Sequence, residues 1–170
     1  MNPVLTRWNE LPEPEAAQEI LPCCGSRRWA HALARLRPFH EAAALLEHSD
    51  DVWSQLDPSD WDEAFASHPR IGEKKAPPSA TAKSAAWSIE EQSGVTRAAA
   101  DVQDRLRRGN EEYERRFGRI YIVCATGKSA EEMLAILERR LENNHAAELL
   151  EAAEQQRQIT QLRLRRWLNL

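Results

Sequence analysis

Apolar residues recur every three or four positions along most of this chain, the spacing that places them on one face of an α-helix. Between residues 26 and 37 the stripe consists of Trp29, Leu33 and Leu36. A second clear stripe runs from residue 145 to residue 168 and ends in basic residues, which suit a helix C-terminus. The pattern therefore predicts a chain of helices separated by proline, glycine and small polar residues.

The stripes and the interruptions between them predict helical segments, with Pro22 and Pro38 ending two of them. A further helix is predicted to begin near Asp60 and to end before Pro69, because the residue that precedes a proline is disfavoured in the helical region. A long helix is expected from Ser84 or Ser88, with a plausible break at Gly109. The other predicted segments are 13–21, 26–37, 39–49 with a separate capped turn after it, 130–144 and 145–168.

Two stretches lack the helical stripe. Residues 70–82 contain Gly72, Pro77 and Pro78 and are predicted to form an irregular loop. Residues 119–125 form a short apolar run rich in β-branched side chains, which is either an extended segment or the buried start of a helix. Ser129 and Glu132 then have the spacing of a capping box at the start of the following helix.

Composition agrees with a helical fold. The chain has 170 residues, about the length of one domain, with 25 Ala and 18 Leu against 5 Val, 7 Ile and 5 Thr. Only 6 Gly are present, and no glycine-rich phosphate-binding motif occurs. We therefore expect an all-α protein: a single-domain helical bundle of six to eight helices over residues 1–170, with one irregular loop.

Charge and hydropathy exclude several function classes. The formal charge of −4 disfavours nucleic acid as a partner, and no apolar run is long enough to span a membrane. The chain begins without a basic segment followed by an apolar stretch, so a cytoplasmic protein is expected. The 3 cysteines include the neighbours Cys23 and Cys24, which lack the spacing of a zinc or redox pair.

His68 is the histidine best placed for chemistry, because it lies in SHPRIG where a predicted helix meets the irregular loop. With a reference pKa near 6.5, a histidine can donate or accept a proton at neutral pH. A histidine before a proline also commonly caps a helix C-terminus, so the structural role remains open. None of the 5 histidines belongs to an HExxH pair, and a metal site is not predicted.

The stretch Ser88, Ile89, Glu90, Glu91 and Gln92 gathers a hydroxyl, two carboxylates and an amide within about one helical turn. Ser88 and Glu91 have capping-box spacing, which predicts a helix beginning here. The free N–H groups of a helix N-terminus also favour an anionic ligand. A structural cap and a substrate site are both compatible with this pattern.

Taken together, four segments resemble one known family. FHEAAALLE with Trp53, WDEAFASHPRIG, WSIEEQSG and YERRFGRIYIVCATGKSAEEMLAILERRLENN are similar to segments of the OHCU decarboxylases, the 2-oxo-4-hydroxy-4-carboxy-5-ureidoimidazoline decarboxylases of urate degradation. The resemblance runs from about residue 8 to residue 167. It implies an all-helical homodimer without metal or organic cofactor, a carboxy-lyase that converts this small-molecule substrate to (S)-allantoin.

The resemblance also implies roles for individual residues. His68 corresponds to the family's catalytic histidine, which acts as general acid or base, and Pro69 follows it in the substrate pocket. Ser88, Ile89, Glu90, Glu91 and Gln92 match the S-x-x-E-Q stretch, in which Glu91 has a catalytic role and orients the substrate. The segment expected to meet the substrate ring through its backbone consists of Tyr121, Ile122, Val123, Cys124 and Ala125.

The chain departs from the family pattern at two places. It reads FGRIY where the family often reads FGFPF, and Thr126 stands where an arginine is common. Arg119 and Lys128 are the alternative cations for the substrate carboxylate. Two other functions remain open: a shifted substrate preference, and a non-catalytic dimeric scaffold whose basic final helix docks an acidic partner through Arg157, Arg163, Arg165 and Arg166.

Overall fold

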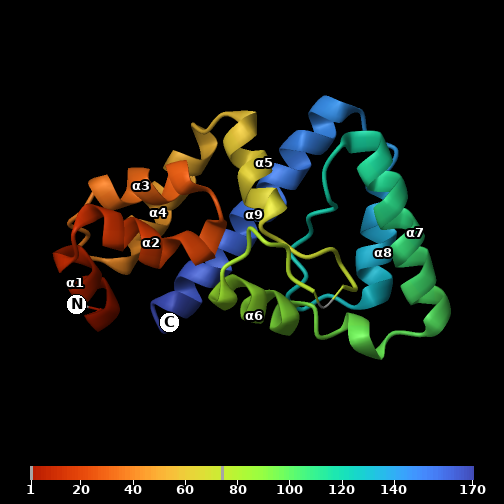
Figure 1. The fold of residues 1–170 in the computed structure, drawn as a ribbon, viewed down its shortest axis with the longest axis horizontal. Coiled ribbons are helices and arrows are strands. Elements are labelled where there is room, and N and C mark those ends of the chain that lie inside the picture. The colour runs from red at the N-terminus through yellow and green to blue at the C-terminus, as the bar shows by residue number, and fades with distance from the viewer. Residues whose placement is uncertain (1, 74) are drawn as a thin grey trace. The chain divides into compact units, whose positions relative to one another are not determined.

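The computed structural model describes residues 2–73 and 75–170, and over these residues the protein is all-α (Figure 1). The described residues form nine α-helices, one 3-10 turn and no β-strand. In chain order these elements are α1 (Pro3–Glu10), α2 (Glu13–Cys24), α3 (Arg27–Arg35), α4 (Ala42–Ser54), α5 (Pro58–Ala66), α6 (Ala82–Glu91), η1 (Val95–Arg97), α7 (Ala100–Phe117), α8 (Ala130–Arg140) and α9 (His145–Trp167).

The predicted fold class is confirmed, and the count of six to eight helices is too low. The sequence pattern missed α1, whose first turn is capped by the side chain of Asn2. It also ended one helix at Pro22, whereas α2 continues through this proline to Cys24 and closes at the left-handed residue Gly25. A proline in the last turn removes one helix hydrogen bond, a small loss beside the packing of the buried residues around it.

The predictions between residues 39 and 117 need two further corrections. The segment 39–49 and the capped turn after it form one helix, α4. The long helix expected from Ser84 or Ser88 is two helices, α6 and α7, separated by the 3-10 turn η1. Gly109 lies inside α7 rather than at a break. The predicted irregular loop is observed over residues 70–73 and 75–81, and residue 74 lies outside the described residues. The capping box of Ser129 and Glu132 is also observed.

The chain divides into two compact units. Unit 1 contains the residues up to Ala64 together with Arg157–Leu170, and unit 2 contains Phe65–Gln156. In unit 1, the indole nitrogen of the fully buried Trp8 donates to the carbonyl of Ala16 at 2.9 Å. Trp8 also meets Trp167 edge to face, with ring centroids 5.6 Å apart, so the first and last helices of the chain pack together.

Unit 2 contains every residue that the sequence singled out for chemistry. Helices α7 and α8 pack side by side within it (Figure 1). Its core surrounds Tyr113 and Tyr121, which are buried among the aliphatic side chains of both helices. A fully buried ion pair between Arg140 and Glu148 lies beside these rings, and the Tyr113 hydroxyl donates to Glu148.

No helix among the described residues is both long enough and apolar enough to cross a membrane.

Candidate functional site

His68 lies just beyond the end of α5 and is 8% exposed. Its backbone N–H donates to the carbonyl of Phe65 at 3.1 Å, which closes the last turn, and Pro69 then prevents the helix from continuing. The ring nitrogen Nε2 lies 2.8 Å from Oε1 of Gln156 on α9. The imidazole is therefore buried and held in orientation by a side chain 88 residues away along the sequence.

Three tethers hold the loop that follows His68. The side chain of Asn110 on α7 donates to the carbonyl of Ile71 at 3.0 Å. The backbone N–H of Gly72 donates to Oε1 of Gln92 at 3.0 Å. Arg70 pairs with Glu114 through two hydrogen bonds, one of them 2.9 Å long. The chain after the histidine is thus irregular in conformation and fixed in position by α6 and α7.

The S-x-x-E-Q stretch lies at the opposite end of its helix from the one predicted. Helix α6 begins at Ala82, and its N-cap is Thr81, whose hydroxyl accepts from the N–H of Ser84 at 3.0 Å. Ser88 and Glu91 lie in the last turn, so the predicted capping box is wrong. A helix C-terminus presents carbonyl oxygens rather than N–H groups, and the expected attraction of an anion to a helix start does not apply here.

The side chains of this last turn face different surroundings. Ser88 is buried, Ile89 is 56% exposed, Glu90 is exposed, and Glu91 and Gln92 are half-buried. The contact between Gln92 and Gly72 brings the end of α6 against the loop that His68 begins. The stretch from Ser88 to Gln92 is therefore joined to the loop after His68 at Gly72, and not to His68 or Pro69 themselves.

The segment Tyr121–Ala125 is buried throughout and belongs to neither a helix nor a strand, so it is not the buried start of a helix; α8 begins at Ala130. Side chains satisfy several of its backbone groups: Arg140 donates to the carbonyl of Ile122 at 2.6 Å, and Lys128 donates to that of Cys124 at 2.7 Å. The N–H of Cys124 donates to Oε1 of Gln155 at 2.9 Å. An extended segment without a neighbouring strand needs such partners, because buried backbone groups are costly when unpaired.

Gln155 and Gln156 are consecutive residues of α9 that contact two different predicted segments. Gln155 binds the backbone of Cys124, and Gln156 binds the ring of His68. Neither glutamine is among the site residues that the sequence predicts. The available signal was the position of Gln156 between Ala152 and Ile159 on the buried stripe of the final helix, where an uncharged polar side chain requires a hydrogen-bonding partner.

The cation beside this segment is held in its charged form. Burial opposes the charge of Arg140, but its hydrogen bonds with Glu148 raise the pKa of the guanidinium above its usual value. Burial also raises the pKa of the Tyr121 hydroxyl, which donates to the carbonyl of Met133 at 3.0 Å. These groups fix the segment in place and do not exchange protons near neutral pH.

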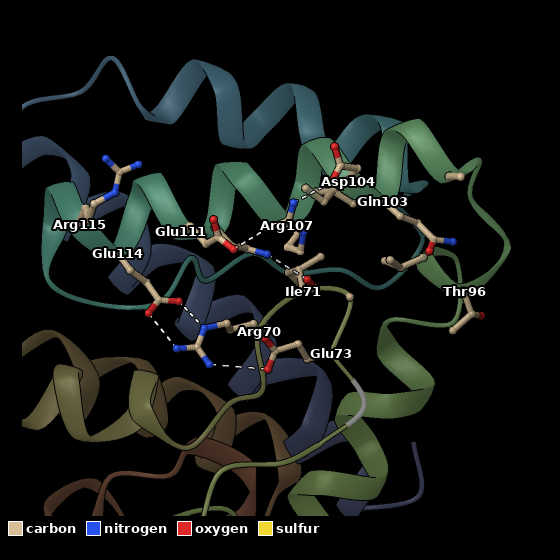
Figure 2. Close-up of a pocket in the computed structure, with 15 residues that line it drawn as sticks. Arg70, Ile71, Glu73, Thr96, Gln103, Asp104, Arg107, Glu111, Glu114 and Arg115 are labelled. Carbon is tan, nitrogen blue, oxygen red and sulfur yellow. Dashed lines mark hydrogen bonds and ion pairs between the residues drawn. The ribbon is translucent and has the colours of Figure 1, made fainter.

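A cavity of about 1080 Å³ lies between the loop after His68, η1 and α7 (Figure 2). Apolar and charged residues both line it, and the charged ones are largely paired: Arg70 points toward Glu114 and Glu73, and Arg107 points toward Asp104 and Glu111 (Figure 2). No residue that the sequence predicted for the site lines this cavity. The lining residues are Arg70, Ile71, Gly72, Glu73, Val95, Thr96, Ala100, Gln103, Asp104, Leu106, Arg107, Asn110, Glu111, Glu114 and Arg115.

Within residues 2–73 and 75–170, no three His, Cys, Asp or Glu side chains are grouped so that they could hold a metal ion.

The described residues form an all-α protein in which two consecutive glutamines of α9 contact a buried histidine and a separate buried segment. The family model described as OHCU decarboxylase matches residues 9–165. The chain therefore belongs to the OHCU decarboxylase family.

Relatives with known names agree with this assignment. The chain is 38% identical over 144 residues to the uric acid degradation bifunctional protein TTL of Arabidopsis thaliana, covering 84% of this chain and 44% of the relative. It is 40% identical over 73 residues to the 2-oxo-4-hydroxy-4-carboxy-5-ureidoimidazoline decarboxylase of Amia calva, covering 43% of this chain and 42% of the relative. The chain thus spans less than half the length of these relatives.

Two solved structures share the fold. A crystal structure of an OHCU decarboxylase in the presence of (S)-allantoin matches with a TM-score of 0.77 and 32% identity, covering 89% of this chain and 98% of the other. A crystal structure of (S)-allantoin synthase matches with a TM-score of 0.72 and 17% identity, covering 96% of this chain and 53% of the other. At the lower identity the likeness concerns the fold alone.

Proposed function

We propose that the protein decarboxylates 2-oxo-4-hydroxy-4-carboxy-5-ureidoimidazoline to (S)-allantoin in urate degradation, without a cofactor. The observation that carries the proposal is the family match over residues 9–165, which includes all three segments expected to form the site. The contacts of Gln92, Gln155 and Gln156 support it, because each ties one of these segments to another part of unit 2.

The substrate's own chemistry makes this reaction possible. Breaking the bond between the ring and the carboxylate releases CO₂ and leaves the electron pair on the ring, whose neighbouring groups can delocalise it. A proton must then be delivered to a ring carbon, and delivery to one face gives a single enantiomer. The protein needs to bind, orient and protonate, which are tasks for a positioned side chain of suitable pKa.

In this proposal His68 is the general acid or base, and Glu91 orients the substrate at the end of α6. One wall of the proposed substrate pocket consists of Pro69, Ser88 and the residues from Ile89 to Gln92, and the segment from Tyr121 to Ala125 forms another. This pocket is not the cavity beside α7. Arg119 and Lys128 are the candidate partners of the substrate carboxylate. Lys128 already donates to the carbonyl of Cys124, so it could bind a carboxylate close to that segment.

The proposal extends to the whole protein. A single decarboxylase domain over residues 1–170, a homodimer and a cytoplasmic location are what the family resemblance leads us to infer. The alternative of a scaffold that docks an acidic partner is less well supported. Two of the arginines it would use have internal partners: Arg157 pairs with Asp50 at 2.7 Å, and the buried Arg163 donates to the carbonyl of Pro22 at 3.3 Å.

The decisive experiment generates the unstable substrate in place, from urate with urate oxidase and hydroxyisourate hydrolase, and follows the circular dichroism of the allantoin formed. Spontaneous decay gives a racemate, so rapid protein-dependent growth of one signal is the expected result. Failure to exceed the background, with both auxiliary enzymes active, would contradict the proposed activity.

The role of His68 is tested in the same assay. Replacing it by Asn should lower the rate by about 10²- to 10⁴-fold while far-UV circular dichroism stays unchanged, because a positioned acid or base contributes about that much. His40→Asn, an exposed histidine outside the predicted site, is the matched control and should retain full activity. Near-normal turnover by His68→Asn would remove His68 from the mechanism.

A further inference from the structure

The contact between His68 and Gln156 has a direction. Oε1 of an amide side chain can only accept a hydrogen bond, so the ring nitrogen 2.8 Å away from it must carry the hydrogen. His68 is 8% exposed and Gln156 is fully buried, so water has little access to replace either partner. The contact therefore selects between the two neutral forms of the imidazole.

We propose that Gln156 is a positioning residue that holds His68 as its Nε2–H tautomer and leaves Nδ1 as the nitrogen that exchanges a proton with the substrate. The inference rests on the proposed function, and it specifies which ring atom performs the chemistry. In a histidine with two distinct nitrogens, the hydrogen bond made by one of them decides the role of the other.

The same contact serves both protonation states of the ring. The imidazolium carries hydrogens on both nitrogens, and the neutral ring keeps the one on Nε2 because Gln156 accepts it throughout. After CO₂ leaves, the proton on Nδ1 forms the new C–H bond with the electron pair left on the ring, and Nδ1 then regains a proton from water. Only Nδ1 changes state, so the imidazole need not turn during the cycle.

Gln156 belongs to a helix that also orients the second predicted segment. Its neighbour Gln155 accepts from the N–H of Cys124 at 2.9 Å. Because the two glutamines are adjacent on α9, the position of the imidazole and the position of the extended segment are set by the same turn of helix. A neutral amide suits this task, since it orients the ring without adding a charge beside the substrate's anionic group.

The test measures the tautomer directly. In protein labelled with ¹⁵N-histidine, two-bond ¹H–¹⁵N correlation spectra at alkaline pH distinguish the Nε2–H form from the Nδ1–H form, and His68→Asn identifies the signals. The wild-type protein should show the Nε2–H form. A wild-type spectrum of the Nδ1–H form would overturn the inference without reference to any variant or activity.

Variants then link the tautomer to turnover. Gln156→Leu removes the acceptor of the Nε2 hydrogen, so the Nδ1–H form should become more populated than in the wild-type protein, and kcat should fall by roughly 10- to 100-fold, the range found when partners that orient metal-binding histidines are lost. Gln156→Glu keeps an accepting oxygen and should retain the Nε2–H form, and it should lose less activity than Gln156→Leu despite the charge that it adds. The matched control is Gln161→Leu on the same helix, whose side chain donates to Asp50 at 2.7 Å, and its His68 tautomer should be unchanged.

The two proposals fail in different ways. Absence of decarboxylation by the wild-type protein would contradict the proposed function, while the spectra would still report the tautomer. Active wild-type protein together with an unchanged tautomer and rate in Gln156→Leu would contradict the positioning role and leave the proposed function intact.

Discussion

At the scale of single residues, unit 2 depends on polar groups that are buried and mutually satisfied. Arg140 and Glu148 have no exposed side-chain surface, and Arg140 donates to Glu148 at 2.9 Å and to the carbonyl of Ile122 at 2.6 Å. Tyr113 and Asn143 donate to the same carboxylate. One acidic side chain thus neutralises the cation that supports the predicted extended segment.

Replacing Glu148 by Leu should destabilise the protein by about 3–5 kcal/mol, because it leaves a buried guanidinium uncompensated. The same replacement at Glu138 is the control: this residue pairs with Arg105 on the surface, where an ion pair contributes about 1 kcal/mol or less. Urea unfolding followed by far-UV circular dichroism measures both. Equal losses in the free energy of unfolding for the two variants would show that the buried pair contributes no more to stability than a surface pair.

Much of this residue-scale arrangement could not be predicted from the sequence. The sequence did predict that His68 lies where a helix meets the irregular loop, since a proline after a helical stripe is a local signal, and its role in chemistry stays a prediction. Gln156 was not selected, because its importance depends on a partner 88 residues away. Nothing within a few positions of a glutamine indicates which distant ring it will meet.

At the scale of elements, the close approach of α7 and α8 explains why Gly109 lies inside a helix and not at the predicted break. A Cβ added at Gly109 would lie 2.6 Å from Cδ2 of Leu137, a fully buried side chain on α8. Glycine is thus present so that two helices can pack tightly, and the helix continues through it. The low helix propensity of Gly109 is offset by the packing of α7 against α8, which involves residues distant in the sequence.

Gly109→Ala should therefore destabilise the protein by about 1–3 kcal/mol, despite a gain of up to about 1 kcal/mol in helix propensity. Leu137→Ala alone should cost about 2–5 kcal/mol, and in the double variant the two losses should not add, because the alanine methyl occupies part of the space vacated by the leucine. Urea unfolding of the four proteins gives the coupling. A stabilised Gly109→Ala variant would show that α7 and α8 do not approach so closely.

Helix ends were predictable where the cap is local. Ser129 and Glu132 form the expected capping box, with the N–H of Ser129 donating to Glu132 at 2.7 Å. Ser88 and Glu91 have the same spacing and form none, because Thr81 already starts that helix seven residues earlier. The same Ser-x-x-Glu spacing thus caps α8 at Ser129 but lies in the last turn of α6 at Ser88.

At the scale of the whole molecule, the candidate site lies entirely within unit 2, between Phe65 and Gln156. Helices α5 and α9 each contribute residues to both units, since the divisions fall after Ala64 and after Gln156. A ligand that binds unit 2 only in its folded state should therefore be detectable through the stability of the folded chain.

If the proposed function holds, (S)-allantoin should raise the melting temperature of the wild-type protein. A concentration of 100 times Kd adds about 2.7 kcal/mol, or roughly 5–10 °C for a domain of this size. Differential scanning calorimetry measures the shift, with (R)-allantoin as the matched control ligand. Equal shifts with both enantiomers would argue against a site that distinguishes the faces of the ring.

The sequence by itself determined the helical class, most helix positions, the irregular loop and the family resemblance, because periodicity, caps and motifs depend on residues close together in the chain. Tertiary structure alone decided that α2 passes through Pro22, that Ser88 and Glu91 end a helix rather than begin one, and that Gly109 is a packing contact. It also decided that Gln156 meets His68. These features depend on contacts between residues distant in sequence, whose free energies outweigh local preference and leave no local pattern.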